Sequence, residues 1–490
     1  MSEYKHGIYT SRKGVAVPVP SECTTNVTVV IGTAPVNTAA DPVAAVNVPI
    51  KLESQTDADE YIGFTEEYGK YTIPHATYAA FYKFAVTPIV VINVLDPENT
   101  RHVEAVAEKT VQLTAGEGVI DDTGILLDKL VLSDGSTTYE EDKDYVASFT
   151  EDGRVLIAVT SDGKMSSADS VMAAYTKLKP EGVTPEDIIG GISEDGSTRT
   201  GMELLDEIYI RYNIVPGQII APGFSKNSAV SAALEAKAQL IAGLTNAIAF
   251  IDLDSSSTGA SSYTMVQEQK EKACIPSRWN VPVWPMVKVN GIPMWYSAFA
   301  ACLIQSRTVA NGNIPSEGPD NYELPIDGIC LEDGTDVYMT QANVNDYINA
   351  YGVASAIKLP TWRFWGGNTA AYPASNDPIN RWIKCVLMLN YLENKFKTEY
   401  MDSVGRSGDY KLVNSIVNEF NTFLNSLTPD HLAGAKILFD KKENPIENIL
   451  LGHYKFRTQY ADYTPMECIE NEFNYDASIL ESALEGGEES

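Results

Sequence analysis

Both ends of the chain carry strand-like patterns that lie too far from any apolar core to fold by themselves. Near the start, Val15, Val17 and Val19 alternate with other residues before Pro20. Near the other end, apolar and aromatic residues recur among acids: Cys468, Ile469, Phe473, Tyr475, Ile479 and Leu480. Each segment therefore needs a sheet elsewhere. The sequence leaves open whether that sheet belongs to the same copy of the chain or to a neighbouring copy.

The two ends also carry opposite charge. Residues 1–20 contain Lys5, Arg12 and Lys13 against Glu3 alone, whereas residues 462–490 contain nine Asp or Glu and no Lys or Arg. Such segments can pair with each other, or they can add to an exposed sheet edge of another subunit. A contact of the second kind joins unlike surfaces and generates rings or filaments.

Between the ends, strand and helix patterns alternate. The β-branched runs 27–31 and 88–94 flank a helical pattern at 75–85, which predicts parallel strands. The alternation continues with helix 201–212, strand 218–221, a helix capped by Ser225 that runs to Ile241, strand 247–251 and strand 283–289. At 490 residues the chain is long enough for about three domains.

One stretch departs from this alternation. Residues 112–183 contain short apolar runs separated by Asp-Asp and Asp-Gly pairs, the residues that favour tight hairpin turns. They predict an all-β insertion with an acidic, solvated surface.

The last part of the chain predicts a closing α+β domain. Asn376–Pro378 supplies an N-cap and a proline for the first turn of a helix that is expected to reach about Tyr400. A second amphipathic helix is predicted over 413–427. Strands follow in the run 437–439 and in an alternating set: Tyr454, Phe456, Thr458 and Tyr460.

Composition excludes several functions. The chain has 36 Lys and Arg against 66 Asp and Glu, and its formal charge of −30 would repel nucleic acid and anionic lipid. No signal-peptide pattern is visible, and no stretch approaches the roughly 20 apolar residues of a membrane span, so a cytoplasmic protein is expected. The six cysteines form no Cys-x-x-Cys pair, which favours buried thiols over disulfides or a zinc site.

No motif for catalysis, a cofactor or a metal ion is present. Phosphate-binding glycine loops, a Gly-x-Ser-x-Gly elbow and His-Glu-x-x-His are all missing from the sequence. Asp252 and Asp254, at a predicted strand end, are the best catalytic candidates, but the sequence places no histidine between 201 and 290. Such carboxylates more often cap a turn. We therefore predict no catalytic residue, no cofactor and no metal site.

Two other clusters have simple structural interpretations. An aromatic concentration that could stack a sugar or a base is more typical of a buried domain junction: Tyr351, Trp362, Trp365, Tyr372 and Trp382. Gly405–Gly408 can be interpreted as an anion loop, but a flexible connection between helices is the simpler interpretation.

Taken in order, several short segments resemble the sheath proteins of contractile phage tails and related injection machines. They run nearly from end to end: Tyr4–Thr10, Val94–Pro97, Asp206–Tyr209, Pro222–Ser225, Trp365–Thr369, Asn376–Asp377, Glu443–Pro445 and Tyr454–Tyr460. Their shared order and spacing carry the resemblance.

The resemblance implies a mechanical function. Sheath subunits of this family stack as six-membered rings around a tail tube, stay extended until a baseplate triggers them, and then contract to drive the tube through a cell envelope. The implied partners are further copies of the chain, the tube protein, and baseplate and tail terminator proteins, without direct nucleic-acid contact or membrane insertion. Assembly is expected in the host bacterial cytoplasm, and the product is a virion tail or contractile particle.

The resemblance also implies a fold: α/β plus α+β, multidomain, with exchanged terminal strands. The implied segments are an N-terminal arm (1–20), an N-terminal α/β domain (21–111), an inserted β-sandwich (112–183), a subtilisin-like α/β domain (184–345), a C-terminal sheath domain (346–464) and a C-terminal arm (465–490).

Finally, the resemblance implies where subunits meet. The arms would contribute Tyr4, Tyr9, Val15, Val17, Val19, Ile469, Phe473 and Tyr475, and an accepting hairpin would include Tyr454, Phe456 and Thr458. Arg381, Lys384 and Lys395 are candidates for contact with the tube, although the paired arginines of many family members are replaced here. A hydrolase using Asp252 and a secreted surface or adhesin protein remain as alternative functions.

Overall fold

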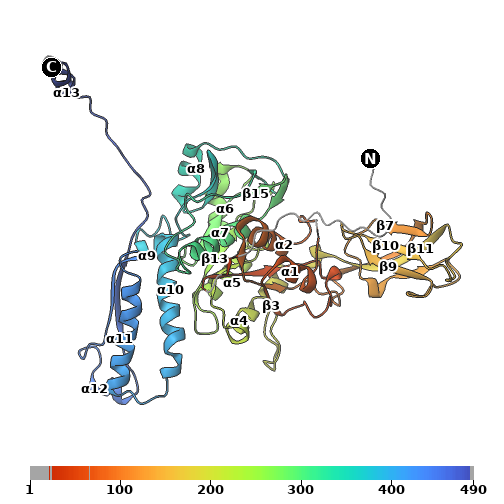
Figure 1. The fold of residues 1–490 in the computed structure, drawn as a ribbon, viewed down its shortest axis with the longest axis horizontal. Helices are drawn as coiled ribbons and strands as arrows, with labels where there is room; N and C mark the ends of the chain where they lie inside the picture. The colour runs from red at the N-terminus through yellow and green to blue at the C-terminus, as the bar shows by residue number, and fades with distance from the viewer. Residues whose placement is uncertain (1–20, 23–24, 66, 486–490) are drawn as a thin grey trace, which may run out of the picture.

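The computed structural model describes residues 21–485 apart from 23, 24 and 66. Three bodies follow one another along the molecule: a β domain, a central α/β body and a helical C-terminal unit (Figure 1). Each body has its own cluster of buried apolar side chains. The predicted N-terminal arm, with Tyr4, Tyr9, Val15, Val17 and Val19, lies outside the described residues.

The central body is built on a six-stranded sheet with the order β14-β13-β12-β2-β5-β3. Its strands are β2 (Val27–Gly32), β3 (Pro49–Leu52), β5 (Ile89–Asn93), β12 (Pro216–Ile220), β13 (Ile248–Asp252) and β14 (Asn280–Val283). Neighbours pair in parallel, except that β3 is antiparallel to β5. The parallel strands are buried at every residue, because both faces of such a sheet are covered.

Two segments that were predicted as separate domains share this sheet. β2, from the predicted domain 21–111, pairs in parallel with β12, from the predicted domain 184–345. The shared core also contains Val353, Phe364 and Val386, so the predicted limit at 346 falls inside it. Strand patterns show where strands lie but not which strand is the neighbour of which, and the sequence therefore did not reveal this union.

Several helices belong to the central body. They are α1 (Gln55–Tyr61), α2 (Ile73–Tyr78) continued by a π-helical segment (Ala79–Phe84), α3 (Pro185–Ile189), α4 (Leu205–Tyr212), α5 (Ser228–Gln239), α6 (Val266–Ala273), α7 (Tyr296–Ala310) and α8 (Gln341–Tyr347). Sequence analysis missed α7, which packs against β2, β12 and β13. This helix is apolar nearly all round because it is buried, and so it lacks the periodic pattern of a surface helix.

Two local predictions were wrong. The helix α5 begins after Asn227, whose side chain accepts a hydrogen bond from the Ala229 N–H at 2.9 Å, and is not capped by Ser225. The predicted strand 283–289 is two strands, β14 and β15 (Met286–Val289), which belong to different sheets. β15 instead pairs with β16 (Ile292–Met294) and β17 (Gly328–Cys330).

The β domain consists of two three-stranded antiparallel sheets, β7-β10-β9 and β6-β11-β8. Its strands are β6 (Val103–Gln112), β7 (Glu117–Ile120), β8 (Val131–Ser133), β9 (Tyr145–Phe149), β10 (Val155–Val159) and β11 (Ser170–Leu178). The domain starts before the predicted limit of 112, because β6 pairs with β11 from Val103 to Gln112.

The C-terminal unit comprises α9 (Pro378–Arg381), α10 (Ile383–Tyr400), α11 (Tyr410–Ser426), β20 (Leu432–Leu438), α12 (Ile446–Leu450) and β21 (Arg457–Asp462). The long predicted helix is interrupted at Trp382, whose extended backbone forms a bridge with Asn368. Asp377 caps α9 through the Ile379 N–H. A short hairpin of β18 (Ser355–Leu359) and β19 (Thr361–Trp365) lies before α9.

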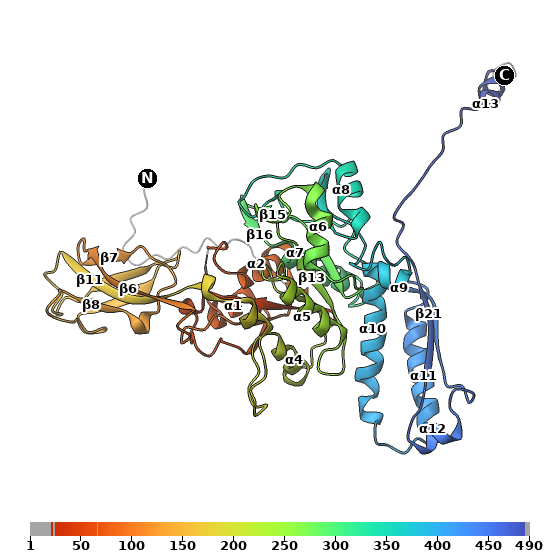
Figure 2. The same ribbon diagram turned by 180° about the vertical axis from the view of Figure 1, so that it is seen from behind.

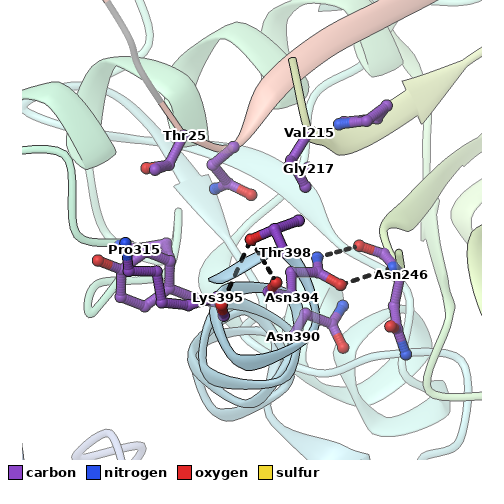
Figure 3. Close-up of a pocket in the computed structure, with 12 residues that line it drawn as sticks. Thr25, Val215, Gly217, Asn246, Pro315, Asn390, Asn394, Lys395 and Thr398 are labelled. Carbon is purple, nitrogen blue, oxygen red and sulfur yellow. Dashed lines mark hydrogen bonds between the residues drawn. The ribbon is translucent and has the colours of Figure 1, made fainter. Parts of the chain in front are cut away.

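An asparagine side chain ties α10 to the central body. The Asn394 amide accepts a hydrogen bond from the Asn246 N–H at 2.8 Å and donates one to the Asn246 carbonyl at 2.7 Å, as a neighbouring strand would (Figure 3). Lys397 Nζ lies 2.6 Å from Asn246 Oδ1. The contacts lie beside a small pocket between α10 and the sheet, and they fix the helix to the chain just before β13.

We predict that Asn394→Ala destabilises the subunit by about 2–4 kcal/mol, because it leaves a buried N–H and a buried carbonyl of Asn246 without partners. Urea unfolding of dilute, unassembled protein measures the change. Asn418→Ala is the matched control, since Asn418 is exposed on α11 and gains the same helix propensity. Equal effects of the two substitutions would contradict this account.

Candidate subunit interface

The best catalytic candidate of the sequence is a structural carboxylate. Asp252, at the end of β13, is only 2% exposed. Its oxygens accept hydrogen bonds from the Ser297 N–H at 2.9 Å and the Ser297 hydroxyl at 2.6 Å, in the first turn of α7, and more weakly from Gly223 N–H and the Ser225 hydroxyl. Burial raises the pKa of Asp252 to about 6, against the effect of these donors. Asp252 therefore joins the sheet to the start of α7.

The two histidines His75 and His102 both make structural contacts. His75 is held by the Tyr68 carbonyl at 2.6 Å and by the Trp295 N–H at 2.9 Å, and His102 faces Asp187. Asp254 accepts a hydrogen bond from the Ser256 N–H at 2.9 Å. Among the described residues, no group of three His, Cys, Asp or Glu side chains could hold a metal ion.

The aromatic concentration also has a structural use. The Arg381 guanidinium lies 4.2 Å from the ring centre of Tyr372 and 4.0 Å from that of Trp382. Trp362 and Trp365 donate their ring N–H groups to the Asp327 carbonyl and the Asn345 side chain. The helices that the structure describes include none long and apolar enough to cross a membrane.

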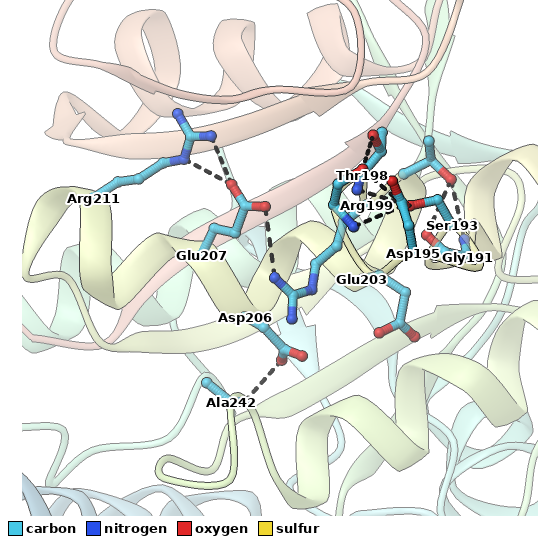
Figure 4. A network of polar contacts seen from close by, with 12 residues as sticks. Gly191, Ser193, Asp195, Thr198, Arg199, Glu203, Asp206, Glu207, Arg211 and Ala242 are labelled. Carbon is cyan, nitrogen blue, oxygen red and sulfur yellow. Dashed lines mark hydrogen bonds and ion pairs between the residues drawn. The ribbon is translucent and has the colours of Figure 1, made fainter.

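A polar loop that projects from the body is held by hydrogen bonds between its own residues. In residues 191–199, the Asp195 carboxylate accepts from the Ser193 hydroxyl at 2.6 Å and from the Ser197 N–H at 3.0 Å (Figure 4). Nearby, Glu207 pairs with Arg211 at 2.7 Å on α4. These acids are occupied within the loop and helix, so the network holds the loop in shape.

The hairpin of β20 and β21 has one sealed edge and one open edge. On β20, the Ile437 N–H and carbonyl bond to the Asn421 side chain of α11 at 2.9 and 3.0 Å. In an antiparallel pair, the backbone N–H and C=O groups of successive residues point alternately toward the partner strand and away from it. Those of Ile437 point away from β21. The backbone groups of Thr458, its direct partner on β21, therefore point away from β20 at the other edge of the hairpin. No described strand pairs with that edge.

The inner face of the hairpin is also incompletely covered at this edge. Ile437 is fully buried against α11, yet Thr458 on the same face is exposed. The Tyr460 hydroxyl, two residues farther, is buried and has no hydrogen-bond partner within the described part of the chain. Of the predicted accepting residues, Thr458 lies on β21, whereas Tyr454 and Phe456 precede the strand. Tyr454 instead donates to the Gly408 carbonyl at 3.0 Å.

The C-terminal arm leaves the body and does not return to it. Residues 463–476 form no helix or strand, and both views show them extending away from α9 (Figures 1 and 2). Ile469, Phe473 and Tyr475 are exposed, Phe473 to 90%. The arm ends in α13 (Ala477–Glu485), which sequence analysis missed. Within the described residues, the intramolecular alternative, an arm folded onto its own sheet, is therefore not adopted.

One ion pair holds the root of the arm. Arg381 donates to Glu467 at 2.5 Å and to the Asn368 side chain at 2.7 Å. The other two candidates for tube contact lie on α10. Lys395 pairs with Glu399 at 2.7 Å, and Lys384 is half-buried near Gly318. Their proposed contact with a tube stays a prediction.

Comparisons with known proteins agree on one family. No family model matches the chain. It is 26% identical over 509 residues to the tail sheath protein of Burkholderia phage BcepMu, an alignment that covers 99% of each chain. A chain of the six-fold symmetrised anti-feeding prophage baseplate is similar, with a TM-score of 0.55 and 13% identity over 97% of this chain and 99% of that one. The contracted PVC sheath complex of an extracellular contractile injection system gives 0.57 and 12%, over 98% and 99%.

We expect Asp252 to make the subunit more stable as the pH falls from 7 to 5. Its pKa is raised from 3.8 to about 6, so in this window the folded chain binds more protons than the unfolded chain, and the free energy of unfolding rises. Relative to Asp252→Asn, the wild type should gain about 1 kcal/mol between pH 7 and pH 5 in urea unfolding.

The control for this pH dependence is Asp254→Asn. Although partial burial opposes it, the Ser256 N–H and Lys226 lower the pKa of Asp254, so its contribution to stability should not rise as the pH falls over the same range. A wild-type advantage over Asp252→Asn that stays flat or shrinks between pH 7 and pH 5 would refute the assignment.

Proposed function

Because the chain belongs to the contractile tail sheath protein family, whose members are structural subunits of assemblies that contract, we propose that it polymerises with copies of itself through exchanged strands. The observation that carries this proposal is the combination of an open strand edge and an exposed, unpaired arm. The chain is a component of a phage tail or related contractile particle and is not an enzyme. The hydrolase alternative built on Asp252 is therefore wrong.

The outer edge of β21 is the acceptor. The backbone groups of Thr458, Tyr460 and Asp462 point away from β20 there, by the alternation that Ile437 sets. An exposed edge of this kind recruits an extended segment through main-chain hydrogen bonds. The Asn421 amide prevents the same addition at Ile437 on β20, so incoming strands are directed to one side of the hairpin.

Residues 469–475 of a neighbouring copy are the donor. In an antiparallel alignment with Phe473 opposite Thr458, the side chains of Ile469, Phe473 and Tyr475 join the inner face that carries Tyr460, and Asn471 lies opposite Tyr460 on the same face. Glu470 and Glu472 then lie on the outer face, where Lys436 is exposed and where Arg457, also exposed, pairs with Glu443. Three apolar or aromatic residues and Asn471 thus cover the uncovered face, and the acidic residues of the donor meet basic residues on the other.

The assembly that follows is a lattice of stacked rings. The baseplate relative has six-fold symmetry, and we extend that symmetry to this chain, with the tail tube inside the rings. The N-terminal arm is proposed to reach another copy in the same way. Terminal arms tie subunits together while the bodies move, so a metastable extended lattice can contract and drive the tube without a bound nucleotide.

The remaining partners follow from the same model. Baseplate and tail terminator proteins bound the two ends of the lattice, and the tube protein lies inside it. We propose assembly in the host bacterial cytoplasm and no direct contact with nucleic acid, consistent with the charge of −30. The secreted adhesin alternative has no observation in its favour.

Thr458→Pro tests the acceptor edge. Proline removes the N–H that would bond to the donated strand, but it leaves all hydrogen bonds between β20 and β21 intact. The subunit should therefore fold, while the yield of sedimentable tubes should fall more than tenfold. Negative-stain microscopy and sedimentation measure the tubes, and circular dichroism measures the fold. Thr458→Ala, which keeps the N–H, is the matched control. Wild-type tube yield from Thr458→Pro would sink the proposal.

A further inference from the structure

We propose that α13 of one subunit docks on an exposed apolar patch at the tip of the C-terminal unit of a second copy. The patch is formed by Ile446, Leu450 and Leu451, on α12 and the residue after it, and is hereafter the tip patch. These side chains are 61%, 79% and 72% exposed. The inference rests on the proposed strand donation and adds a helical contact to it.

The tip patch is a surface without a cover. Ile446 and Leu450 lie four residues apart on α12 and therefore share a face of this helix. The Asn444 side chain closes the loop at its base, bonding to the Lys455 N–H at 2.7 Å and to the Lys455 carbonyl at 2.8 Å. The apolar side chains are thus held outward by a defined loop. Clustered exposed leucines of this kind mark interaction sites.

The helix α13 is the complementary partner. Its nine residues are too few to be stable alone in water, where helices shorter than ~12–15 residues are marginal. Ile479, Leu480 and Leu484 are all exposed, and Asp476 caps the helix through the Ser478 N–H at 2.9 Å. An amphipathic helix with an exposed apolar side needs a surface to pack against.

Charge favours the same pairing. The arm and helix contain only acidic charges from Asp462 onward, including Glu481 on α13. Beside the tip patch, Lys441 and Lys442 are exposed and form no ion pair with any described residue. Opposite charges around an apolar centre orient a docking segment and exclude like-charged partners.

Geometry brings the two together. β21 runs from Arg457, next to the loop that carries α12, towards Asp462 at the root of the arm, and Figure 2 shows α12 and the root at opposite ends of the unit. A donated strand that is antiparallel to β21 therefore runs towards the tip. With Phe473 opposite Thr458, residue 477 falls opposite Tyr454, and α13 begins beside α12. The occupant is thus the same neighbouring copy that donates the strand.

Truncation after Asp476 separates the two contacts. It removes α13 but keeps residues 469–475, so tubes should still form with roughly tenfold lower yield, whereas deletion of 463–490 should abolish them. Leu450→Glu/Leu451→Glu should cause the same roughly tenfold loss. Because both changes break one contact, combining them should be no worse than either alone. Glu447→Ala, on the exposed polar side of α12, is the matched control and should assemble as wild type.

Crosslinking identifies the occupant. In a Cys468→Ser background, one pool carries Leu480→Cys and a second, differently tagged pool carries Leu450→Cys. After co-assembly and oxidation, disulfide-linked pairs should contain one chain of each tag.

The outcomes are distinct. Wild-type tubes from the truncation together with none from the 463–490 deletion would overturn the docking of α13 but leave strand donation intact. Wild-type tubes from both would overturn both. Additive losses in the combined variant, or no mixed disulfide, would assign the tip patch to another partner such as the tube and refute the proposal.

Discussion

The structure depends on an unequal hairpin. One edge of the β20–β21 pair is occupied by a side chain of the same chain, Asn421, which bonds to both main-chain groups of Ile437. The other edge has no neighbour among the described strands. A strand edge is a liability in a lone protein because it recruits other chains without discrimination. Here one side is closed and the other is left available, so the strand addition that we propose can occur on one side of the hairpin.

The remainder of the molecule keeps that hairpin in a fixed place. The parallel sheet and the buried helix α7 form one core with residues as far along the chain as Leu387. The Asn394 amide then couples α10 to the end of the loop before β13. The C-terminal unit is thus fixed to the body, whereas the C-terminal arm, held at its root by Arg381, is exposed from Cys468 to Leu484. This division suits an assembly whose subunits move as rigid bodies.

The same body shows why an α/β sheet end need not be an active site. Asp252 sits where many α/β enzymes place a catalytic carboxylate, at the carboxyl end of a parallel strand. Its hydrogen-bond partners are N–H and hydroxyl groups of the scaffold, two of them from Ser297 at the start of α7. The carboxylate is used to fasten a helix to the sheet. Position in the fold and chemical function are separate properties.

The sequence by itself determined the existence and type of most elements. The runs at 27–31 and 88–94, the helix over 413–427 and the exposed apolar arm after Pro465 were all visible, because local patterns of burial leave a period in the sequence. Only the tertiary structure decided that β2 lies beside β12, that the helix after Pro378 breaks at Trp382, and which edge of the hairpin stays open. Those features depend on contacts between residues distant in the chain, whose partners no local pattern records. The helix α7 was hidden for a related reason, since a segment buried on every side has no polar face to give it a period.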